Sequence, residues 1–331
     1  MSPYIVAELN TSHFGDLGIA RDMIDQAKAS GCDCVKFQSW SAETLYSESY
    51  YKENAIARRV VKKFALDNAQ LKELAFHART VGIDFASTPY SIEEAEFLVQ
   101  ECNVPFVKIA SMELNNLPYL TQLGHLNVPL VLSTGMGMLE EIIQAVRTIE
   151  ATGNMQQLVI LHCTSVYPAA PEIIRLQNIT GLRSEFPNHP IGYSDHSLGI
   201  EIPAASVALG ACLIEKHFTL DKTRIGMDNQ MATEPAEMQA MTYACRRVHA
   251  ALGGTGRVLS VEEQRQIPKM RRSLITRHAL PAGHIITEAD LDTKRPGTGL
   301  APMHLQTVLG KKLNQEAKAE TVLTWQMLSD K

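Results

Sequence analysis

Two histidines, His196 and His217, each end a short apolar run beside charged residues in the stretch GYSDHSLGIEIPAASVALGACLIEKHFTL, residues 192–220. Two imidazoles at neighbouring strand ends could bind a divalent ion such as Mn²⁺ and leave positions open for water or substrate oxygens. In a chain with 11 histidines, the same pair is also compatible with structural histidines that are hydrogen-bonded in a core. The residue types alone leave both alternatives open.

Polar side chains that could bind an anion follow several other apolar runs. These side chains belong to Lys36, Thr88, Lys108, Ser111, Ser133 and Ser194, and two carboxylates, Glu8 and Glu113, occupy similar positions. Hydroxyls often only cap helices, but lysine is rarely buried without a partner. Two lysines at adjoining strand ends therefore indicate a small substrate that carries phosphate and carboxylate groups.

The elements that must position these residues alternate in a regular way along the first 250 or so residues. Predicted strands cover 4–9, 33–38, 83–88, 105–111, 129–135, 158–164, 190–195 and 212–218. Predicted helices cover 18–30, 68–81, 91–101, 116–125, 138–152, 172–186, 199–210 and 235–252. Eight strand–helix units predict a (β/α)8 TIM barrel, an α/β fold in which catalytic groups gather at the C-terminal ends of the strands.

Glycines at the expected helix ends support this division into strands and helices. Gly31, Gly82, Gly124, Gly153 and Gly210 follow predicted helices, as C-terminal capping glycines do. The long insertion 39–67, rich in Tyr, Glu, Lys and Arg, is a candidate lid or rim over the second strand.

The composition changes after the phrase ALGGTGRVLS. We predict a barrel domain over 1–255, a polar linker over 256–271 and a small domain over 272–331. Two similar phrases in the last segment, HALPAGHIITEADL and QEAKAETVLTWQML, indicate a pseudo-repeat. A unit of this size lies near the lower limit for folding alone, so we expect it to be stabilised by contact with a larger unit.

Composition excludes several classes of protein. A net charge of −5 argues against a nucleic-acid surface, and no apolar run approaches the ~20 residues that span a bilayer. The N-terminus begins with a strand-like pattern and has no basic leader, so we predict a cytoplasmic protein. The six cysteines lack paired zinc-type spacing and are expected to be reduced and packed.

A set of ordered motifs extends over nearly the whole chain: AELNTSHFGD, VKFQ, STPY, VKIASMELNN, LSTGM, LHCTSVYP, IGYSDHSLG and IEKHFTLD, followed by RRSL and KRPGTGL. In these motifs the chain resembles the sialic acid synthase family, whose members make N-acetylneuraminate and related nonulosonic acids such as legionaminic and pseudaminic acid. The resemblance implies a TIM barrel joined to a C-terminal antifreeze-like (SAF) domain. It also implies a domain-swapped homodimer in which the SAF domain covers the partner's active site.

The resemblance further implies a reaction and residue roles. Phosphoenolpyruvate would condense with the open-chain form of an N-acylated hexosamine, with phosphate lost by C–O cleavage. The residues that would bind phosphoenolpyruvate are Lys36, Thr88, Lys108, Ser111, Ser133 and Ser194. A divalent metal, Mn²⁺ with Mg²⁺ or Co²⁺ as alternatives, would be held by His196 and His217. The sugar would contact Tyr167, Asp228 and Arg295, and Glu8 and Glu113 would act near the sugar and the attacking water.

Departures from the family pattern leave the sugar open. Asn10 stands where many members have glycine, Ser12 where they have asparagine, and Ser165 where the bacterial N-acetylneuraminate enzymes have asparagine. The substrate could be N-acetylmannosamine or a 2,4-diacetamido-6-deoxy hexose. Two other functions remain as alternatives: a phosphoenolpyruvate-condensing synthase for a phosphorylated aldose, and a non-catalytic carbohydrate-binding protein.

Overall fold

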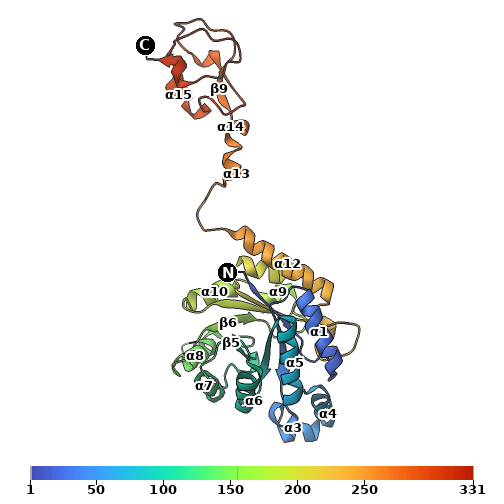
Figure 1. Ribbon diagram of the computed structural model, residues 1–331. Coiled ribbons are helices and arrows are strands. Elements are labelled where there is room, and N and C mark those ends of the chain that lie inside the picture. Colours follow the sequence, from blue (N-terminus) through green and yellow to red (C-terminus); the bar gives the residue numbers. More distant parts are fainter. Residues whose placement is uncertain (1, 155, 331) are drawn as a thin grey trace. The chain divides into compact units, whose positions relative to one another are not determined.

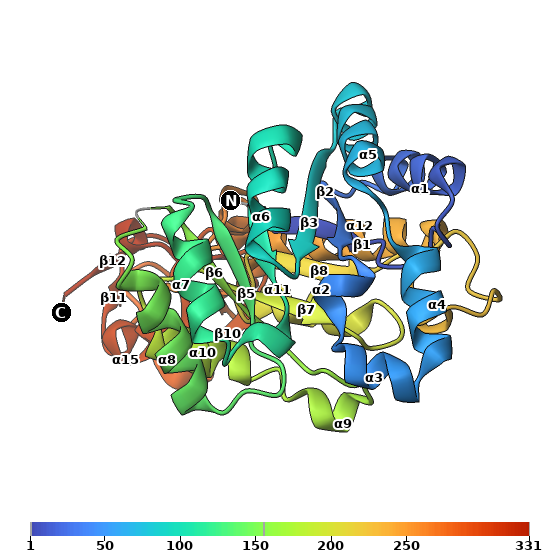
Figure 2. The ribbon, with the colours of Figure 1, turned by 90° about the horizontal axis from the view of Figure 1, so that it is seen from below.

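The computed structural model describes residues 2–154 and 156–330, which form two compact units divided between Gly253 and Gly254. The first unit holds eight parallel strands in one sheet that curves into a near-barrel, with helices outside it (Figure 1 and Figure 2). The strands are β1 (Tyr4–Glu8), β2 (Cys34–Ser39), β3 (Asp84–Pro89), β4 (Val107–Ile109), β5 (Leu130–Ser133), β6 (Leu158–Cys163), β7 (Ile191–Asp195) and β8 (Leu213–His217). Their order is β3-β2-β1-β8-β7-β6-β5-β4, and the two end strands, β3 and β4, lie in contact. The predicted TIM barrel is confirmed.

Helices follow the strands as the sequence pattern predicts. They are α1 (Leu17–Ala29), α5 (Asn68–Val81), α6 (Ile92–Phe97), α7 (Leu117–His125), α8 (Leu139–Glu150), α9 (Pro171–Ile174), α10 (Asn178–Glu185), α11 (Glu201–Ala208) and α12 (Pro235–Leu252). The insertion after β2 is helical and contains α2 (Ala42–Leu45), α3 (Glu48–Glu53) and α4 (Ala55–Phe64). Figure 2 shows α3 and α4 next to each other at the edge of this unit.

Two details differ from the sequence-based expectation. The single helix predicted over 172–186 is broken into α9 and α10, because Arg175 adopts a left-handed conformation (φ 51°). Gly124 was expected to follow its helix but lies inside α7. A Cβ there would press against the side chain of Thr152, so close packing, not capping, requires this glycine. The other four predicted capping glycines have φ values between 75° and 96°.

Alternation along the strands separates an apolar barrel interior from a polar mouth. Val6, Ala86, Val131, Leu161 and Leu213 pack together inside the barrel. Side chains on a strand alternate in direction, so the residue two positions further along each strand also points into the barrel, nearer its C-terminal mouth. These residues are Glu8, Thr88, Ser133, Cys163 and Glu215.

The second unit has its own core, built from Leu274, Leu280, Ile286, Leu313, Leu323 and other apolar residues. It contains α13 (Val261–Gln264), α14 (Ile267–Met270), β9 (Ser273–Thr276), β10 (Leu291–Lys294), α15 (Leu305–Val308), β11 (Lys312–Leu313) and β12 (Leu328–Ser329). Each of the two similar phrases runs through a turn into a 3₁₀ turn and then a strand, and a Leu280–Ala317 bridge joins them. The pseudo-repeat is therefore present in the structure.

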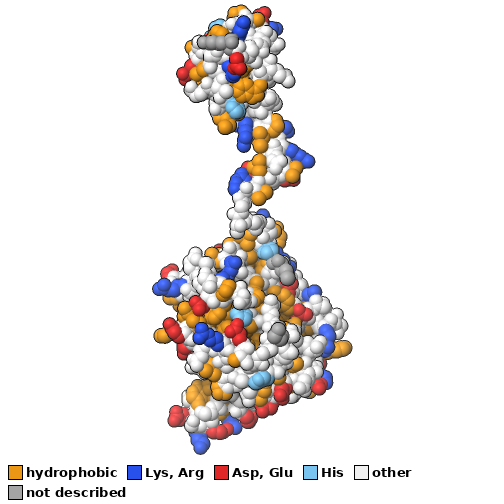
Figure 3. Space-filling model, turned by 90° about the vertical axis from the view of Figure 1, so that its left-hand side faces the viewer, with side chains coloured by type: hydrophobic (Ala, Val, Ile, Leu, Met, Phe, Trp, Pro, Cys, Tyr) orange, Lys and Arg blue, Asp and Glu red, His pale blue; other side chains and the backbone are white. Residues whose placement is uncertain are grey.

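Charged side chains are spread over the surface, and the cysteines are unpaired. Figure 3 shows one face, on which acidic and basic side chains are interspersed over the barrel unit. All six cysteines are free, and only Cys212 is exposed. Within 2–154 and 156–330, no helix has the length and apolar character needed to cross a membrane. The cytoplasmic location stays a prediction.

Candidate active site

A cavity of about 350 Å³ opens at the C-terminal ends of the barrel strands. All of the site residues predicted from the sequence line it, except Glu113 and Arg295. The register of the sheet explains this convergence, because Glu8 is paired with both Lys36 and His217, and Ser194 is paired with Glu215.

Two buried lysines face two buried carboxylates across this cavity. Lys36 Nζ forms an ion pair with Glu8 and lies 3.8 Å from Glu215 Oε2. Lys108 Nζ lies 3.5 Å from Glu215 Oε1. The charges of the four side chains balance, so the lysines can be buried without an external anion.

Burial and this ion-pair network shift the pKa of each charged group. Burial alone would raise the pKa of Glu215, but Lys108 and Lys36 lower it to about 2. Burial opposes the charge on Lys36, yet Glu215 and Glu8 raise its pKa. Burial lowers the pKa of Lys108 and raises that of Glu8. Glu215 is therefore the fixed negative charge between the lysines, and Glu8 is the carboxylate that takes up a proton more readily.

Hydroxyl groups complete the anion-binding part of the cavity. Lys36 Nζ donates to Thr88 Oγ1 and Lys108 Nζ donates to Ser133 Oγ, both at 2.8 Å. Ser194 Oγ donates to Glu215 Oε1 at 3.0 Å. Ser111 Oγ accepts a hydrogen bond from the backbone nitrogen of Gly135 at 3.1 Å. A Cβ at Gly135 would collide with the side chains of Ser111 and Ser165, so glycine keeps this corner of the site open.

The two histidines lie side by side at the ends of β7 and β8. Their ring centroids are 5.4 Å apart, and the ring of Tyr167 lies 4.1 Å from that of His196. His196 Nδ1 donates to the carbonyl oxygen of Thr164 at 2.8 Å, so Nε2 is the ring nitrogen left to accept. Burial would lower the pKa of His196, but a hydrogen bond between its side chain and Cys163 raises it. Burial, and then the charge of His196, lower the pKa of His217, so this ring is a neutral imidazole.

These features fit a divalent metal ion. Metal-binding histidines commonly use one nitrogen as ligand and donate the other N–H to a carbonyl, as His196 can. Across the described ranges, no cluster of three or more His, Cys, Asp or Glu side chains has metal-binding geometry. His196 and His217 would thus supply two protein ligands and leave the remaining positions to water or substrate oxygens.

Residues from several loops form the outer part of the cavity. Asn10 Nδ2 donates to Asp228 Oδ2 at 2.5 Å, and Gln38 Nε2 donates to Glu8 Oε1 at 2.9 Å. Tyr167 is 48% exposed and lies at the opening. Polar groups of this kind could orient the hydroxyl and amide groups of a sugar.

Comparison with known proteins decides the family. Residues 23–257 match the NeuB family and residues 271–329 match the SAF domain. The chain belongs to the NeuB family.

Named relatives agree with this assignment. The chain is 38% identical to N,N'-diacetyllegionaminic acid synthase of Campylobacter jejuni over 96% of this chain and 98% of the relative. It is 37% identical to N,N'-diacetyllegionaminic acid synthase of Legionella pneumophila over 98% of this chain and 94% of the relative. Among solved structures, the N-acetylneuraminic acid synthetase of Leptospira borgpetersenii is 32% identical, with a TM-score of 0.74 over 81% of this chain and 90% of that one.

Two predicted site residues of this NeuB-family chain do not line the cavity. Glu113 lies just beyond β4 and accepts a hydrogen bond from Asn116 Nδ2 at 2.7 Å. Its charge nevertheless acts on a residue of the cavity wall, Tyr90. Burial raises the pKa of Tyr90, and the negative charges of Glu8 and Glu113 raise it further. Arg295 lies exposed in the second unit, after β10.

The sequence places Glu215 and Gln38 at strand ends that converge on the mouth of the barrel, but neither is among the predicted site residues. Glu215 stands two residues before His217 on the same strand, so alternation places both side chains on the inner face. Gln38 likewise follows Lys36 by two residues. The period-two pattern was the signal that could have identified both residues.

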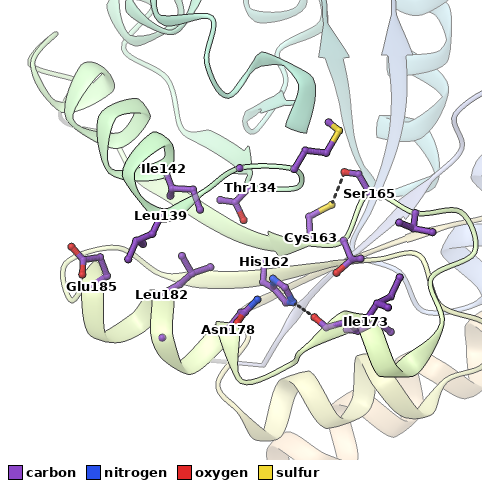
Figure 4. Close-up of a pocket in the computed structure, with 16 residues that line it drawn as sticks. Thr134, Leu139, Ile142, His162, Cys163, Ser165, Ile173, Asn178, Leu182 and Glu185 are labelled. Atoms are coloured by element: carbon purple, nitrogen blue, oxygen red, sulfur yellow. Dashed lines mark hydrogen bonds between the residues drawn. The ribbon is translucent and has the colours of Figure 1, made fainter.

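A second cavity of about 530 Å³ lies beside the first and shares Met136, Cys163 and Ser165 with it. Figure 4 shows its walls, in which Ile142, Leu182 and Ile173 are prominent. Ser165 and Cys163 contact each other (Sγ to Oγ 3.9 Å) where the two cavities adjoin. The polar cavity is therefore bordered by a more apolar one.

Proposed function

We propose that this protein is a nonulosonic acid synthase that condenses phosphoenolpyruvate with an N-acylated hexosamine and releases phosphate. The observation that carries the proposal is one cavity that holds two buried lysines with four hydroxyls and, at its edge, two adjacent histidines. The lysines and hydroxyls suit a small anion, and the histidines suit a metal that polarises an aldehyde. The named relatives make N,N'-diacetyllegionaminic acid or N-acetylneuraminic acid, which agrees with this chemistry.

Phosphoenolpyruvate would bind at the lysine pair. Lys36 and Lys108 would bind its phosphate and carboxylate, and Thr88, Ser111, Ser133 and Ser194 would donate hydrogen bonds to the same oxygens. Glu215 would stay ionised between the two lysines, because its pKa is about 2. The fixed ammonium groups then require little reorganisation when the anion arrives.

Carbon 3 of phosphoenolpyruvate would attack the aldehyde carbon of the open-chain sugar, and water would add at carbon 2. Phosphate would then leave by cleavage of its C–O bond. Glu8 is the proposed group that holds or moves a proton at the water, since burial raises the pKa of its carboxyl above the ordinary value. Glu113 would act at the rim, near Tyr90, by orienting a sugar hydroxyl.

A divalent ion, which we propose to be Mn²⁺ with Mg²⁺ or Co²⁺ as substitutes, would be held by His196 and His217. When bound, such an ion supplies a Lewis acid for the aldehyde oxygen. The Thr164 carbonyl holds His196 in the tautomer in which Nε2 is the accepting nitrogen, and Tyr167 packs on its ring. These contacts keep the imidazole in position without the substrate. Cys163, which pairs with the His196 ring, would give up that contact to a bound ion.

The second unit would serve the site of a partner subunit in a domain-swapped homodimer. Arg295 would reach the acyl group of the partner's sugar, and residues 256–271 would act as the linker. Two features support this proposal: Arg295 is exposed, and neither short helix of the linker, α13 or α14, contains a buried residue. Tyr167 and Asp228 would contact the sugar from the barrel side.

The two alternative functions fit less well. A phosphorylated aldose would need a further cationic cluster, but within the described residues the cavity is lined by two lysines and no arginine. Lys216 does not supply a further cation, because it is buried in an ion pair with Asp195. A binding protein without catalysis would not need the metal-type histidines beside a buried lysine pair.

The test is phosphate release from phosphoenolpyruvate with Mn²⁺, with and without chelator, across a panel of sugars. The panel contains N-acetylmannosamine, 2,4-diacetamido-6-deoxy hexoses and arabinose 5-phosphate. Metal-dependent release with an N-acyl sugar supports the proposal. Release with arabinose 5-phosphate alone, or with no sugar at all, contradicts it.

A further inference from the structure

The loop after β1 holds a phenylalanine in a left-handed backbone conformation. Phe14 has a φ of 54°, in a region that favours glycine and strains a bulky side chain. A residue keeps such a conformation only when its surroundings hold it there, and strained residues are concentrated at functional sites. The contacts of the Phe14 ring therefore indicate what this strain serves.

The ring of Phe14 packs against the loop that follows β8. The guanidinium carbon of Arg224 lies 3.7 Å from the centre of this ring, which makes a cation–π contact. A Cβ at Gly226 would lie 3.3 Å from Phe14 Cε1 and 2.9 Å from the Asn229 Cβ, so a side chain there would push the loop away from the ring. Asp228, two residues further along, lines the candidate active site.

Hydrogen bonds close this loop on itself and link Asp228 to the cation–π contact. Asn229 is fully buried, and its Nδ2 donates to the carbonyl oxygens of Asp221 and Arg224, both at 2.8 Å. The residue whose cation lies on the aromatic ring is thus tied to the residue next to Asp228. Asp228 also accepts a hydrogen bond from Asn10 at 2.5 Å, which is a second connection between the loops after β8 and β1.

Phe14 also contacts the insertion after β2. Its ring lies 6.1 Å from that of Phe64, the last residue of α4, at an angle of 64°. The same insertion contributes Tyr46 to the wall of the cavity. One ring thus joins the loop that carries Asp228 to a second segment of the wall.

We propose that Phe14 is a positioning residue that holds Asp228 where it contacts the sugar, an inference that rests on the proposed condensation. Phe14 is not among the residues that line the cavity, so it acts through Asp228 and not by touching the substrate. Residues 222–225 are exposed, so the loop has little buried surface of its own to fix its position. The ring of Phe14 anchors the loop, and a carboxylate in a fixed position binds a sugar hydroxyl at a lower cost in entropy.

The experiment measures kcat, and KM for the sugar and for phosphoenolpyruvate, with the N-acyl sugar of the panel that the wild-type protein turns over fastest. Phe14→Leu should raise KM for the sugar about tenfold. Arg224→Met, which removes the cation at an exposed position, should raise it about two- to fivefold. In both variants kcat and KM for phosphoenolpyruvate should change by less than about twofold, because Lys36 and Lys108 lie on β2 and β4.

A double variant tests whether Phe14 acts through Asp228. Asp228→Ala should itself raise KM for the sugar. Addition of Phe14→Leu to Asp228→Ala should raise it by less than about twofold more, because no carboxylate remains to be positioned. Two effects that multiply in full would mean that Phe14 acts independently of Asp228, and would overturn the proposal.

Two matched controls remove contacts of the same kind elsewhere. Phe106→Leu removes a buried ring that packs edge-on against Tyr4 at the other end of the barrel, and Arg247→Met removes a cation 5.5 Å from the ring of Tyr243 on α12. Both should leave KM for the sugar within about twofold of the wild-type value. An unchanged KM for the sugar in the two test variants, or an equal rise in KM for both substrates, would overturn the positioning role while the synthase function stands. No phosphate release with any sugar would instead overturn the function itself.

Discussion

The rings of His196 and His217 lie 5.4 Å apart at an angle of 52°, each at the end of its strand and each almost fully buried. Two imidazoles this close in a core would gain little from packing alone, because each has polar nitrogens that need partners. One nitrogen of His196 is satisfied by Thr164. The close approach of the two rings is explained if the remaining nitrogens bind a metal ion.

We therefore expect His196→Ala and His217→Ala each to abolish turnover while the protein stays folded. Loss of one of two protein ligands should also lower bound Mn²⁺, measured by elemental analysis after dialysis. Circular dichroism checks the fold, and the matched control is His189→Ala, which removes a partly buried histidine that pairs with Glu150. Normal turnover in either variant, together with activity of the chelator-treated enzyme, would show that the histidines have no metal role.

Glu215 lies between the two lysines and neutralises part of their charge. Removing its charge should therefore lower the stability of the fold but strengthen anion binding. Glu215→Gln leaves two buried ammonium groups with one carboxylate, and we expect unfolding free energy to fall by about 3 kcal/mol. The same change makes the cavity more positive, so phosphoenolpyruvate should bind more tightly than in the wild type. Calorimetric titration and denaturant unfolding measure the two effects.

A matched control for this prediction is Glu113→Gln, which changes a carboxylate outside the cavity wall. It should alter neither phosphoenolpyruvate affinity nor stability by more than about 1 kcal/mol. Weaker phosphoenolpyruvate binding in Glu215→Gln would mean that Glu215 contacts the ligand favourably, against the role given to it here.

Much of the fold was predictable because strand and helix periods repeat eight times. All eight strands were predicted near their observed bounds, since short buried runs flanked by Gly and Pro are distinctive. The break at Arg175 was not predictable, because nothing in the apolar pattern marks a left-handed arginine. The role of Gly124 was also missed, since it depends on contact with Thr152 in the turn that follows α8.

The candidate site was predictable to a similar degree. Its prediction was incomplete because contacts between distant residues leave no local pattern in the sequence. Strand-end position identified Lys36, Lys108 and the histidines, because a barrel brings those ends together. Which carboxylates pair with the lysines depends on distances across the barrel, so the sequence did not show the role of Glu215. The link between Asn10 and Asp228 joins residues 218 positions apart and has no local signal.

Arg295 is the proposed contribution of the second unit to a partner's site. Deletion of 272–331 should remove sugar affinity more than phosphoenolpyruvate affinity, because the phosphoenolpyruvate groups lie in the barrel. Arg295→Ala should reproduce the loss of sugar affinity, whereas Lys294→Ala, which removes an exposed neighbouring cation paired with Glu320, should not. Unchanged sugar affinity in the deletion would refute the covering role.

Behind the histidines, Lys216 and Asp195 form a buried ion pair between β8 and β7, and Asp195 also accepts from Tyr193 and Ser197. Lys216→Met should lower unfolding free energy by about 3–5 kcal/mol, because it leaves a buried carboxylate uncompensated. Lys222→Met is the control, since Lys222 is 45% exposed and its ion pairs are longer. Denaturant unfolding should show a change below about 1 kcal/mol for the control. Equal losses in the two variants would contradict a stabilising role for the buried pair.

Asp290 should make the second unit sensitive to acid. Its carboxylate accepts hydrogen bonds from His284, His278 and Thr287. Burial would raise its pKa, but the hydrogen bonds from His284 and Thr287 lower it well below the ordinary range. A depressed pKa means that the folded state binds the proton less readily than the unfolded state. The contribution to stability is therefore complete above the ordinary Asp pKa of about 3.9 and is lost as the pH falls below it.

Asp290→Asn should accordingly destabilise the second unit at pH 7 by about 1–3 kcal/mol, and by less as the pH approaches 3. The chain contains two tryptophans, Trp40 and Trp325, so a Trp40→Phe background makes Trp325 fluorescence report on this unit alone. Denaturant titrations of that background with and without Asp290→Asn, at several pH values, measure the difference. Because the carboxylate is protonated in both folded and unfolded states at sufficiently low pH, the part of the difference that comes from its charge must vanish there. A difference that is the same at pH 7 and pH 3 would mean that packing of the side chain, and not its charge, stabilises the unit.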